Sequence, residues 1–139
     1  QQAERLKQNA EKYEEFRDAN AKKRKEVHDV EMEKLRSLLE ADTMTPTEKR
    51  LRSIREKEKG NECFKAQEYE EAIRNYSKSI CLAPENALTY CNRALVYLKQ
   101  NNFQVAEDDC TMAIERDEKY IKAWTRRGTV RFRMGKYED

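Results

Sequence analysis

The chain has 139 residues, a length typical of one domain. Forty per cent of the residues are charged, yet the formal net charge is only +2, so the two signs alternate along the chain. This argues against a binder of duplex nucleic acid, which usually carries a markedly basic face. Three Gly and two Pro leave little material for β-turns, and there is no apolar run of about 18 residues. We therefore expect an all-α protein without a membrane-spanning helix.

Residues 1–41 favour a long charged helix, because Gln, Glu, Lys, Arg and Ala dominate them and neither Gly nor Pro interrupts them. Their apolar positions form a thin stripe that cannot bury much surface. The helix could be a solvent-exposed spacer, a weak coiled-coil partner, or a partner-binding helix ordered only within a larger assembly. Sparse apolar heptad positions disfavour an autonomous coiled coil. The basic run at 22–25 has acidic neighbours and is typical of a solvated helix face.

A break at 42–45 precedes the second predicted helix. Thr45 suits the N-cap, Pro46 the first helical position, and Glu48 the third position of a capping box. This helix is expected to reach about residue 66 and to begin a repeat domain over 46–139. Further helices are expected from 68 to before 84, and at 87–100, 104–117 and 120–134.

An internal repeat of about 34 residues underlies these later helices. Small residues and aromatics recur in phase, and such residues allow two antiparallel helices to cross closely. The matching positions are Gly60, Ala94 and Gly128; Tyr69, Phe103 and Tyr137; Ala72 and Ala106; and Tyr76 and Cys110. Each unit is therefore expected to be a helix-turn-helix.

At these residues the sequence resembles the tetratricopeptide repeat family, over roughly the last three-fifths of the chain. The resemblance implies a solenoid of two full repeats and a partial third. Tyr90, Tyr97 and Trp124 occupy positions where the family places core aromatics. Because the third unit stops before its second helix is complete, we expect the domain to be truncated there and to belong to a longer protein.

The four cysteines and the single histidine are too scattered to suggest a metal site. Cys63, Cys81, Cys91 and Cys110 have no CxxC spacing, and His28 is distant in sequence. We expect free thiols that pack between helices, and neither a metal nor another cofactor. Reduced thiols are typical of the cytosol, which favours a cytoplasmic protein.

Five polar residues are expected to converge on one groove. In such a solenoid the first helices of successive repeats line the concave face. Lys57 and Asn61 lie four residues apart on one of these helices, Asn92 on the next, and Lys122 and Arg126, again four apart, on the third. Three cations and two amides without an acid suit the capture of paired carboxylates, such as those of a chain terminus that ends in Asp.

These residues resemble the two-carboxylate clamp of tetratricopeptide co-chaperones, whose pattern is K-x-x-x-N, N-R and K-x-x-x-R on successive helices. All five positions match. The resemblance implies that the ligand is the C-terminal EEVD peptide of heat-shock protein 70 or 90. A secondary part of the groove, for the rest of the peptide, is expected to contain Phe64, Lys65, Leu95, Leu98, Lys99, Phe132 and Arg133.

The favoured function is a co-chaperone adaptor. The segment TPTEKRLRSIREKEKGNECF resembles repeats of adaptors that assemble axonemal dyneins and other multisubunit complexes, which would place the protein in the cytoplasm or near cilia. The alternative is a structural scaffold in a ciliary or cytoskeletal assembly. An enzyme is disfavoured, because no Gly-rich phosphate loop is present and no nucleophile has a base nearby in the sequence.

Overall fold

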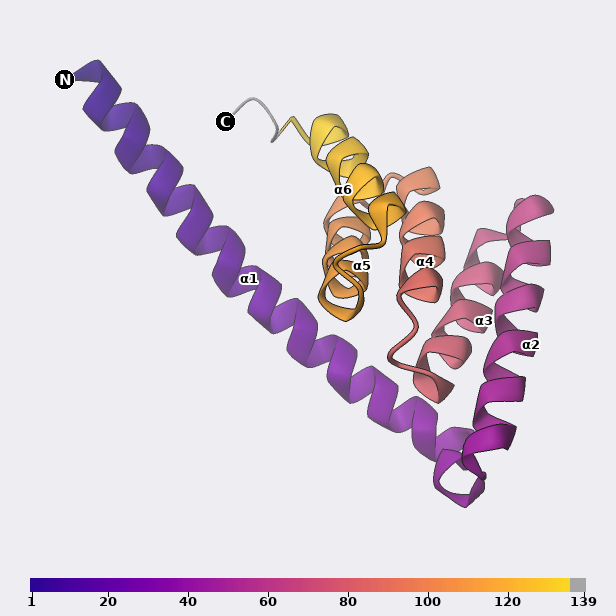
Figure 1. Cartoon of the computed structure of the whole chain (residues 1–139). Helices are drawn as coiled ribbons and strands as arrows, with labels where there is room; N and C mark the ends of the chain where they lie inside the picture. The colour runs from indigo at the N-terminus through magenta and orange to yellow at the C-terminus, as the bar shows by residue number, and fades with distance from the viewer. Residues whose placement is uncertain (136–139) are drawn as a thin grey trace.

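The computed structural model describes residues 1–135, apart from the side chains at positions 13, 14 and 16–18. Every regular element within this range is helical, which confirms the predicted all-α class. A long helix and a short 3-10 turn come first, followed by five helices that stack side by side (Figure 1). The elements are α1 (Gln2–Leu38), η1 (Ala41–Thr43), α2 (Pro46–Lys65), α3 (Tyr69–Leu82), α4 (Ala87–Lys99), α5 (Phe103–Arg116) and α6 (Ile121–Arg133).

The start of α2 is fixed by the predicted capping box. The Thr45 hydroxyl accepts a hydrogen bond from the Glu48 backbone N–H at 3.2 Å, and the Glu48 carboxylate accepts one from the Thr45 N–H at 3.2 Å. Pro46 occupies the first turn, where its missing N–H would have no helical partner anyway. The helix therefore begins at the expected residue.

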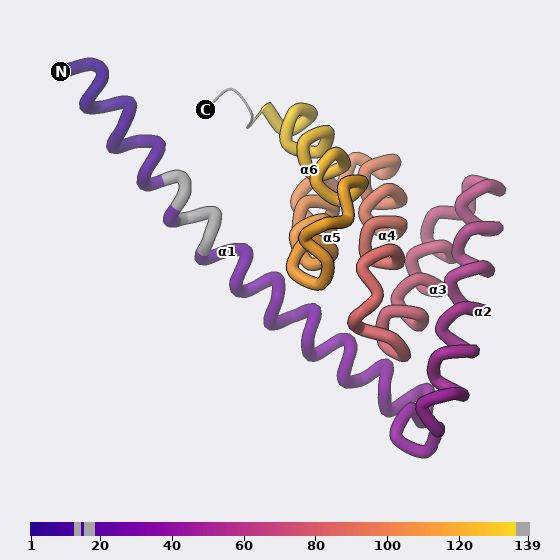
Figure 2. The backbone as a smooth tube through the Cα atoms, in the orientation of Figure 1, coloured from indigo at the N-terminus to yellow at the C-terminus, as the bar shows by residue number. Residues whose placement is uncertain are grey.

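Two helix-turn-helix units follow, α2 with α3 and α4 with α5, and the backbone doubles back between the members of each pair (Figure 2). Two positions after the end of the first helix of each pair comes a residue with left-handed backbone, Gln67 (φ 62°) after α2 and Asn101 (φ 60°) after α4. Gly135, after α6, has φ 73°. These three positions are spaced by the repeat period, so the turn geometry repeats together with the sequence.

The core lies where the helices of a pair cross. Gly60 lies against the ring of Tyr76, and Ala72 is fully buried beside it. In the second unit Ala94 and Ala106 take the corresponding positions without any exposure. All four cysteines are free; three of them are buried and Cys63 is half-buried, as expected for thiols that pack between helices.

Two core predictions are wrong, and both concern the third repeat. Trp124 was expected in the core but is 46% exposed; its indole N–H donates to the Glu118 carbonyl at 2.8 Å, and the Arg127 guanidinium lies over its ring. Gly128 was expected at a helix crossing but has no atom within 4 Å of a Cβ position. Both predictions are wrong for the same physical reason. Within the described residues, no second helix follows α6 to cover the face that carries Trp124 and Gly128.

The second half of α1 packs on the solenoid, although its thin apolar stripe predicts little burial. The Arg24 guanidinium binds both carboxylate oxygens of Asp108 in α5, at 2.6 and 3.2 Å. The His28 ring lies 6.3 Å from the buried Tyr90 ring, measured between centroids. Residues 1–12 are exposed, and Figure 1 shows this end of α1 projecting past the stack. Charge pairing therefore helps to dock this helix, together with the packing of Met32 against the core around Tyr90.

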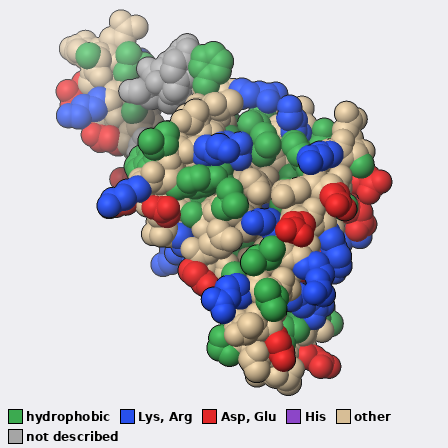
Figure 3. All heavy atoms as spheres, turned by 45° about the vertical axis from the view of Figure 1, so that its right-hand side comes forward, with side chains coloured by type: hydrophobic (Ala, Val, Ile, Leu, Met, Phe, Trp, Pro, Cys, Tyr) green, Lys and Arg blue, Asp and Glu red, His purple; other side chains and the backbone are tan. Residues whose placement is uncertain are grey.

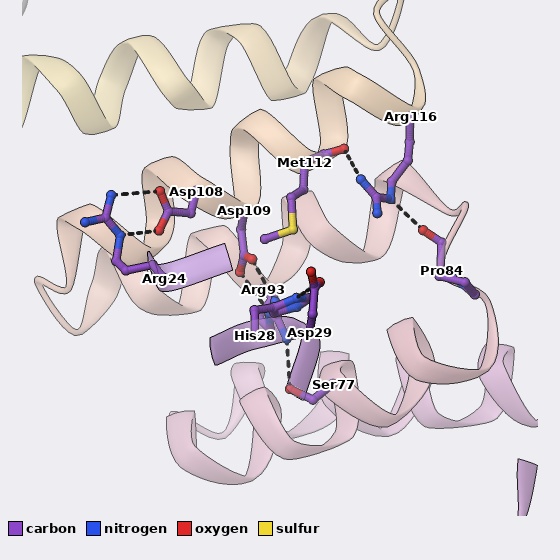
Figure 4. A network of polar contacts seen from close by, with 10 residues as sticks. All are labelled: Arg24, His28, Asp29, Ser77, Pro84, Arg93, Asp108, Asp109, Met112 and Arg116. Atoms are coloured by element: carbon purple, nitrogen blue, oxygen red, sulfur yellow. Dashed lines mark hydrogen bonds and ion pairs between the residues drawn. The ribbon is translucent and has the colours of Figure 1, made fainter. Parts of the chain in front are cut away.

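Three consecutive acids of α5 bind three different helices. Glu107 accepts from Arg131 of α6 at 2.8 Å, Asp108 binds Arg24 of α1, and Asp109 binds Arg93 of α4. Successive residues of a helix point in directions about 100° apart, which lets neighbours in sequence reach separate partners. Two of these pairs appear in Figure 4, with the Arg93 guanidinium also donating to the Ser77 hydroxyl of α3.

Acidification is expected to loosen the docking of α1. Burial and the Arg93 charge hold the pKa of His28 below its ordinary value, although Asp109 and Asp29 act in the opposite direction. The undocked helix therefore binds a proton more tightly than the docked one, so the stability of docking should fall as the pH drops below about 6.5. Hydrogen exchange of the α1 amides at pH 7.5 and 5.5, corrected for intrinsic rates, measures this change.

His28→Phe is the matched control, because it keeps a ring against Tyr90 but cannot take up a proton. Its docking should be insensitive to this pH change. Equal protection of α1 at both pH values in the unmodified chain would contradict the prediction.

Candidate functional site

The five predicted site residues lie on the first helices of the repeats. Lys57 and Asn61 are one turn apart on α2, Asn92 is on α4, and Lys122 and Arg126 are one turn apart on α6. Lys122 is exposed and the other four are half-buried. All five side chains can therefore reach a ligand while four of them are partly held by the fold.

Arg126 connects α6 to α4. Its guanidinium Nη1 donates to the Cys91 carbonyl oxygen at 2.6 Å and lies 3.2 Å from the Cys91 Sγ. Burial raises the pKa of the Cys91 thiol, and the charges of Arg126 and Lys122 oppose that shift, so both cations lie near it. Arg126 therefore holds α6 against the part of α4 that carries Asn92.

The α2 side of the site is connected through Tyr76 of α3. The Tyr76 hydroxyl donates a hydrogen bond to the Asn61 Oδ1. Burial raises the pKa of Tyr76 to about 12, and the Arg126 charge acts against this rise, which places Arg126 near the hydroxyl that holds Asn61. Arg126 is thus close both to the Asn61 contact and to the residue before Asn92. Lys57 lies one helical turn before Asn61.

The site presents donors and positive charge. Lysine ammonium, arginine guanidinium and asparagine NH2 groups can all bind carboxylate oxygens, and none of the five residues is acidic. On the face of the molecule that Figure 3 presents, basic, acidic and hydrophobic side chains are interspersed.

The site lies apart from the docked α1. A groove of about 1030 Å³ runs between α1 and the repeats, and both Arg93 and Arg127 line it. Asn92 and Arg126, which precede them directly, do not line it, because neighbouring residues of a helix face different directions. The docking of α1 therefore leaves the predicted site open.

The residues predicted for the secondary groove have mixed environments. Phe64 and Leu95 are half-buried, whereas Lys65, Lys99 and Phe132 are exposed. Leu98 is buried in the core formed by α4, α5 and α6. Arg133 donates to the Asn101 side chain at 3.0 Å and lies over the Phe103 ring, so it is engaged within the fold.

Sequence reasoning did not connect Tyr76 or Cys91 to the site. Tyr76 was interpreted only as a helix-crossing residue, and Cys91 only as packing. The contact between Tyr76 and Asn61 could have been suspected from the sequence. Asn61, Gly60 and Tyr76 occur together in the first repeat, whereas the second repeat has Leu95, Ala94 and Cys110 at these positions. The hydrogen bond from Arg126 to the Cys91 carbonyl could not have been predicted from the sequence, because every residue has a backbone carbonyl.

The described residues contain no group of three His, Cys, Asp or Glu side chains that could hold a metal ion. None of the described helices is long and apolar enough to cross a membrane.

Comparison with known sequences places the repeats in a family. The family profile described as "TPR repeat" matches residues 60–101, and that described as "Tetratricopeptide repeat" matches residues 87–120. RNA polymerase II-associated protein 3 of Rattus norvegicus is 46% identical over 83 residues, which is 60% of this chain but 13% of that protein. The chain therefore spans a small part of the length of this relative.

Solved structures of similar domains agree with the sequence match. The second tetratricopeptide domain of Spaghetti (RPAP3), bound to the HSP90 peptide SRMEEVD, is 44% identical with a TM-score of 0.64, and the match covers 67% of this chain and 85% of that one. The second such domain of human RPAP3, in complex with the HSP70 peptide SGPTIEEVD, is 43% identical with a TM-score of 0.60, covering 66% and 74% respectively. The helix pairs, their period and these likenesses agree: the chain belongs to the tetratricopeptide repeat family.

Proposed function

We propose that this chain is a co-chaperone adaptor module that binds the C-terminal EEVD-type peptide of heat-shock protein 70 or 90. The observation that carries the proposal is the hydrogen bond from Arg126 of α6 to the Cys91 carbonyl of α4, the residue before Asn92. The first helices of three successive repeats thus contribute donors to the proposed site. The relatives bound to peptides ending in EEVD support the choice of ligand.

The mechanism of binding follows from the donors. A peptide that ends in Asp has a main-chain and a side-chain carboxylate close together, and the cations of α2 and α6 together with the two amides can bind both. Affinity on the order of micromolar is expected, because a short peptide buries little area and loses conformational freedom on binding. The affinity should fall as salt is added, because exposed charges such as Lys122 are screened.

A peptide titration tests the proposal. A fluorescent peptide ending in EEVD should bind the chain, and its C-terminal amide should bind roughly tenfold more weakly or worse, because one carboxylate is lost. Lys122→Ala should weaken binding of the free acid by roughly fivefold to tenfold. Arg126→Ala should weaken it at least as much, because it also removes the contact with Cys91.

Lys119→Ala is the charge-matched control, since Lys119 is exposed in the turn before α6 and is not among the five site residues. It should leave the affinity unchanged. Equal affinity for the acid and the amide, or no binding by the folded chain, would overturn the proposal.

We also propose that this protein acts in the cytoplasm, near cilia, in assembling multisubunit complexes such as axonemal dyneins. The resemblance of residues 45–64 to adaptors of that kind supports this. A structural scaffold remains the second candidate, favoured by the exposed first turns of α1, which project beyond the repeats (Figure 1). The titration separates the two, since a scaffold need not bind the peptide.

A further inference from the structure

The hydroxyl of Tyr76 connects the core of the first repeat to the peptide site. Tyr76 is 2% exposed, and its ring packs in the core between α2 and α3. Its hydroxyl nevertheless reaches the side chain of Asn61, which is half-buried at the edge of the site, and donates to Oδ1. A core residue therefore determines how a ligand-binding amide is oriented.

The contact depends on a close helix crossing. A Cβ atom at Gly60 would lie 2.6 Å from Tyr76 Cε1 and 2.7 Å from Cδ1, so the ring rests directly on the backbone of α2. Only glycine permits this approach. In the second repeat the corresponding residues are Ala94, Leu95 and Cys110. The repeat that supplies Asn61 is thus also the one that carries a tyrosine across from it.

The direction of the hydrogen bond between Tyr76 and Asn61 determines which end of the Asn61 amide faces the ligand. An asparagine amide has an acceptor end and a donor end, and either can be turned toward the ligand. A phenol hydroxyl can donate or accept, and here it donates to Oδ1, which leaves the NH2 end for the ligand. The opposite orientation would turn Oδ1 toward the carboxylates of a peptide terminus, which would repel it. The hydroxyl keeps its proton at neutral pH, as an ordinary tyrosine does, and burial raises the pKa of Tyr76 further, to about 12.

We propose that Tyr76 is a positioning residue that makes the site select a terminal carboxylate over a carboxamide, by holding Asn61 with its NH2 group toward the ligand. This inference rests on the proposed function, because it concerns the same peptide site. Tyr76 does not bind the peptide itself; it acts through Asn61. Without the hydroxyl, Asn61 can turn its Oδ1 outward and accept a hydrogen bond from an amide terminus.

Tyr76→Phe tests the proposal, because it removes one oxygen and keeps the ring. The affinity for the EEVD acid should fall by roughly fivefold to tenfold, because Asn61 no longer holds its NH2 group toward the charged carboxylate of the peptide. The affinity for the EEVD amide should stay equal or rise. The ratio of the acid affinity to the amide affinity should therefore fall by at least the same factor. Tyr69→Phe is the control: Tyr69 packs on Phe64 in the same interface, and the second repeat carries Phe103 at this position.

A second measurement does not need the peptide. The side-chain NH2 signals of Asn61 in an NMR spectrum of the free protein should shift in Tyr76→Phe, while those of Asn92 remain in place. Circular dichroism of each variant establishes that it is folded. A purely structural role for Tyr76 predicts instead that acid and amide affinities fall together.

The outcomes separate the two proposals. If the unmodified chain binds the acid peptide but Tyr76→Phe keeps the same acid-to-amide ratio, or if the Asn61 signals do not move, the inference about Tyr76 is overturned and the proposed function stands. If the unmodified chain binds neither peptide, the proposed function is overturned, and the selectivity assigned to Tyr76 falls with it.

Discussion

Asp109→Ala is expected to lower the free energy of unfolding by about 3–5 kcal/mol, because it leaves a buried arginine without its partner. The Asp109 side chain is completely buried and that of Arg93 is 4% exposed. Arg93 donates to the two carboxylate oxygens at 2.8 and 2.7 Å. Burial is the largest single influence and lowers the pKa of Arg93, but the charge and hydrogen bonds of Asp109 together with the nearby tyrosines outweigh it and raise the pKa, so the arginine remains charged in the core. Urea or thermal unfolding measures the loss.

The neighbouring acid provides a matched comparison. Asp108→Ala removes the same group from the preceding position, but Arg24 and Asp108 keep 28% and 22% of their side-chain surface exposed. Water can solvate Arg24 after the change, so the loss should be no more than about 1 kcal/mol. A loss for Asp109→Ala that is no larger than for Asp108→Ala would contradict the argument from burial.

A double variant checks the cause. Arg93→Met combined with Asp109→Leu replaces both charges with apolar groups, and buried ion pairs replaced in this way often lose little stability. The double variant should therefore be more stable than Asp109→Ala alone.

Gly60→Ala and Gly128→Ala are expected to change stability in opposite directions. At Gly60 the added methyl would meet the Tyr76 ring at 2.6 Å, and that ring is buried and cannot move aside freely. Such overpacking costs about 1–3 kcal/mol, which outweighs the gain of about 0.5–1 kcal/mol that alanine has over glycine within a helix. At Gly128 there is open space, so only the gain remains. Denaturant unfolding of the two variants measures both changes.

The Tyr76 ring is the stated cause of the Gly60 effect, and this can be checked separately. In a Tyr76→Cys background, which has the side chain that the second repeat carries at this position, Gly60→Ala should cost nothing. An equal cost in both backgrounds would assign the effect to something other than the ring.

The repeat domain could be predicted from the sequence because its constraints are periodic. A small residue such as Gly60 or Ala94 recurs where helices cross, and the turn positions Gln67 and Asn101 recur with the same spacing. The docking of α1 could not be predicted in this way. It depends on contacts between residues distant in the sequence, such as the pair of Arg24 with Asp108, whose members are 84 residues apart, and no periodic pattern marks either one.

The candidate site was predictable in part. The phase of the repeat places Asn92 and Arg126 at equivalent positions of successive helices, and this phase is visible in the sequence. How the side chains are held is not visible, since the bond from Tyr76 to Asn61 depends on how closely two helices approach. The position of Trp124 in the repeat predicted burial, but the side chain is exposed. A repeat position therefore predicts burial only where a neighbouring helix covers it.

The pairing of α1 with α5 also has a consequence for synthesis on the ribosome. Arg24 is translated long before Asp108, which follows 84 residues later, and at about 5–20 residues per second the ribosome takes roughly 4–17 s to add them. During this interval α1 has emerged but its docking surface does not yet exist. A helix with a continuous apolar stripe would be prone to aggregate in that time, whereas the charged α1 can remain solvated until α5 is complete.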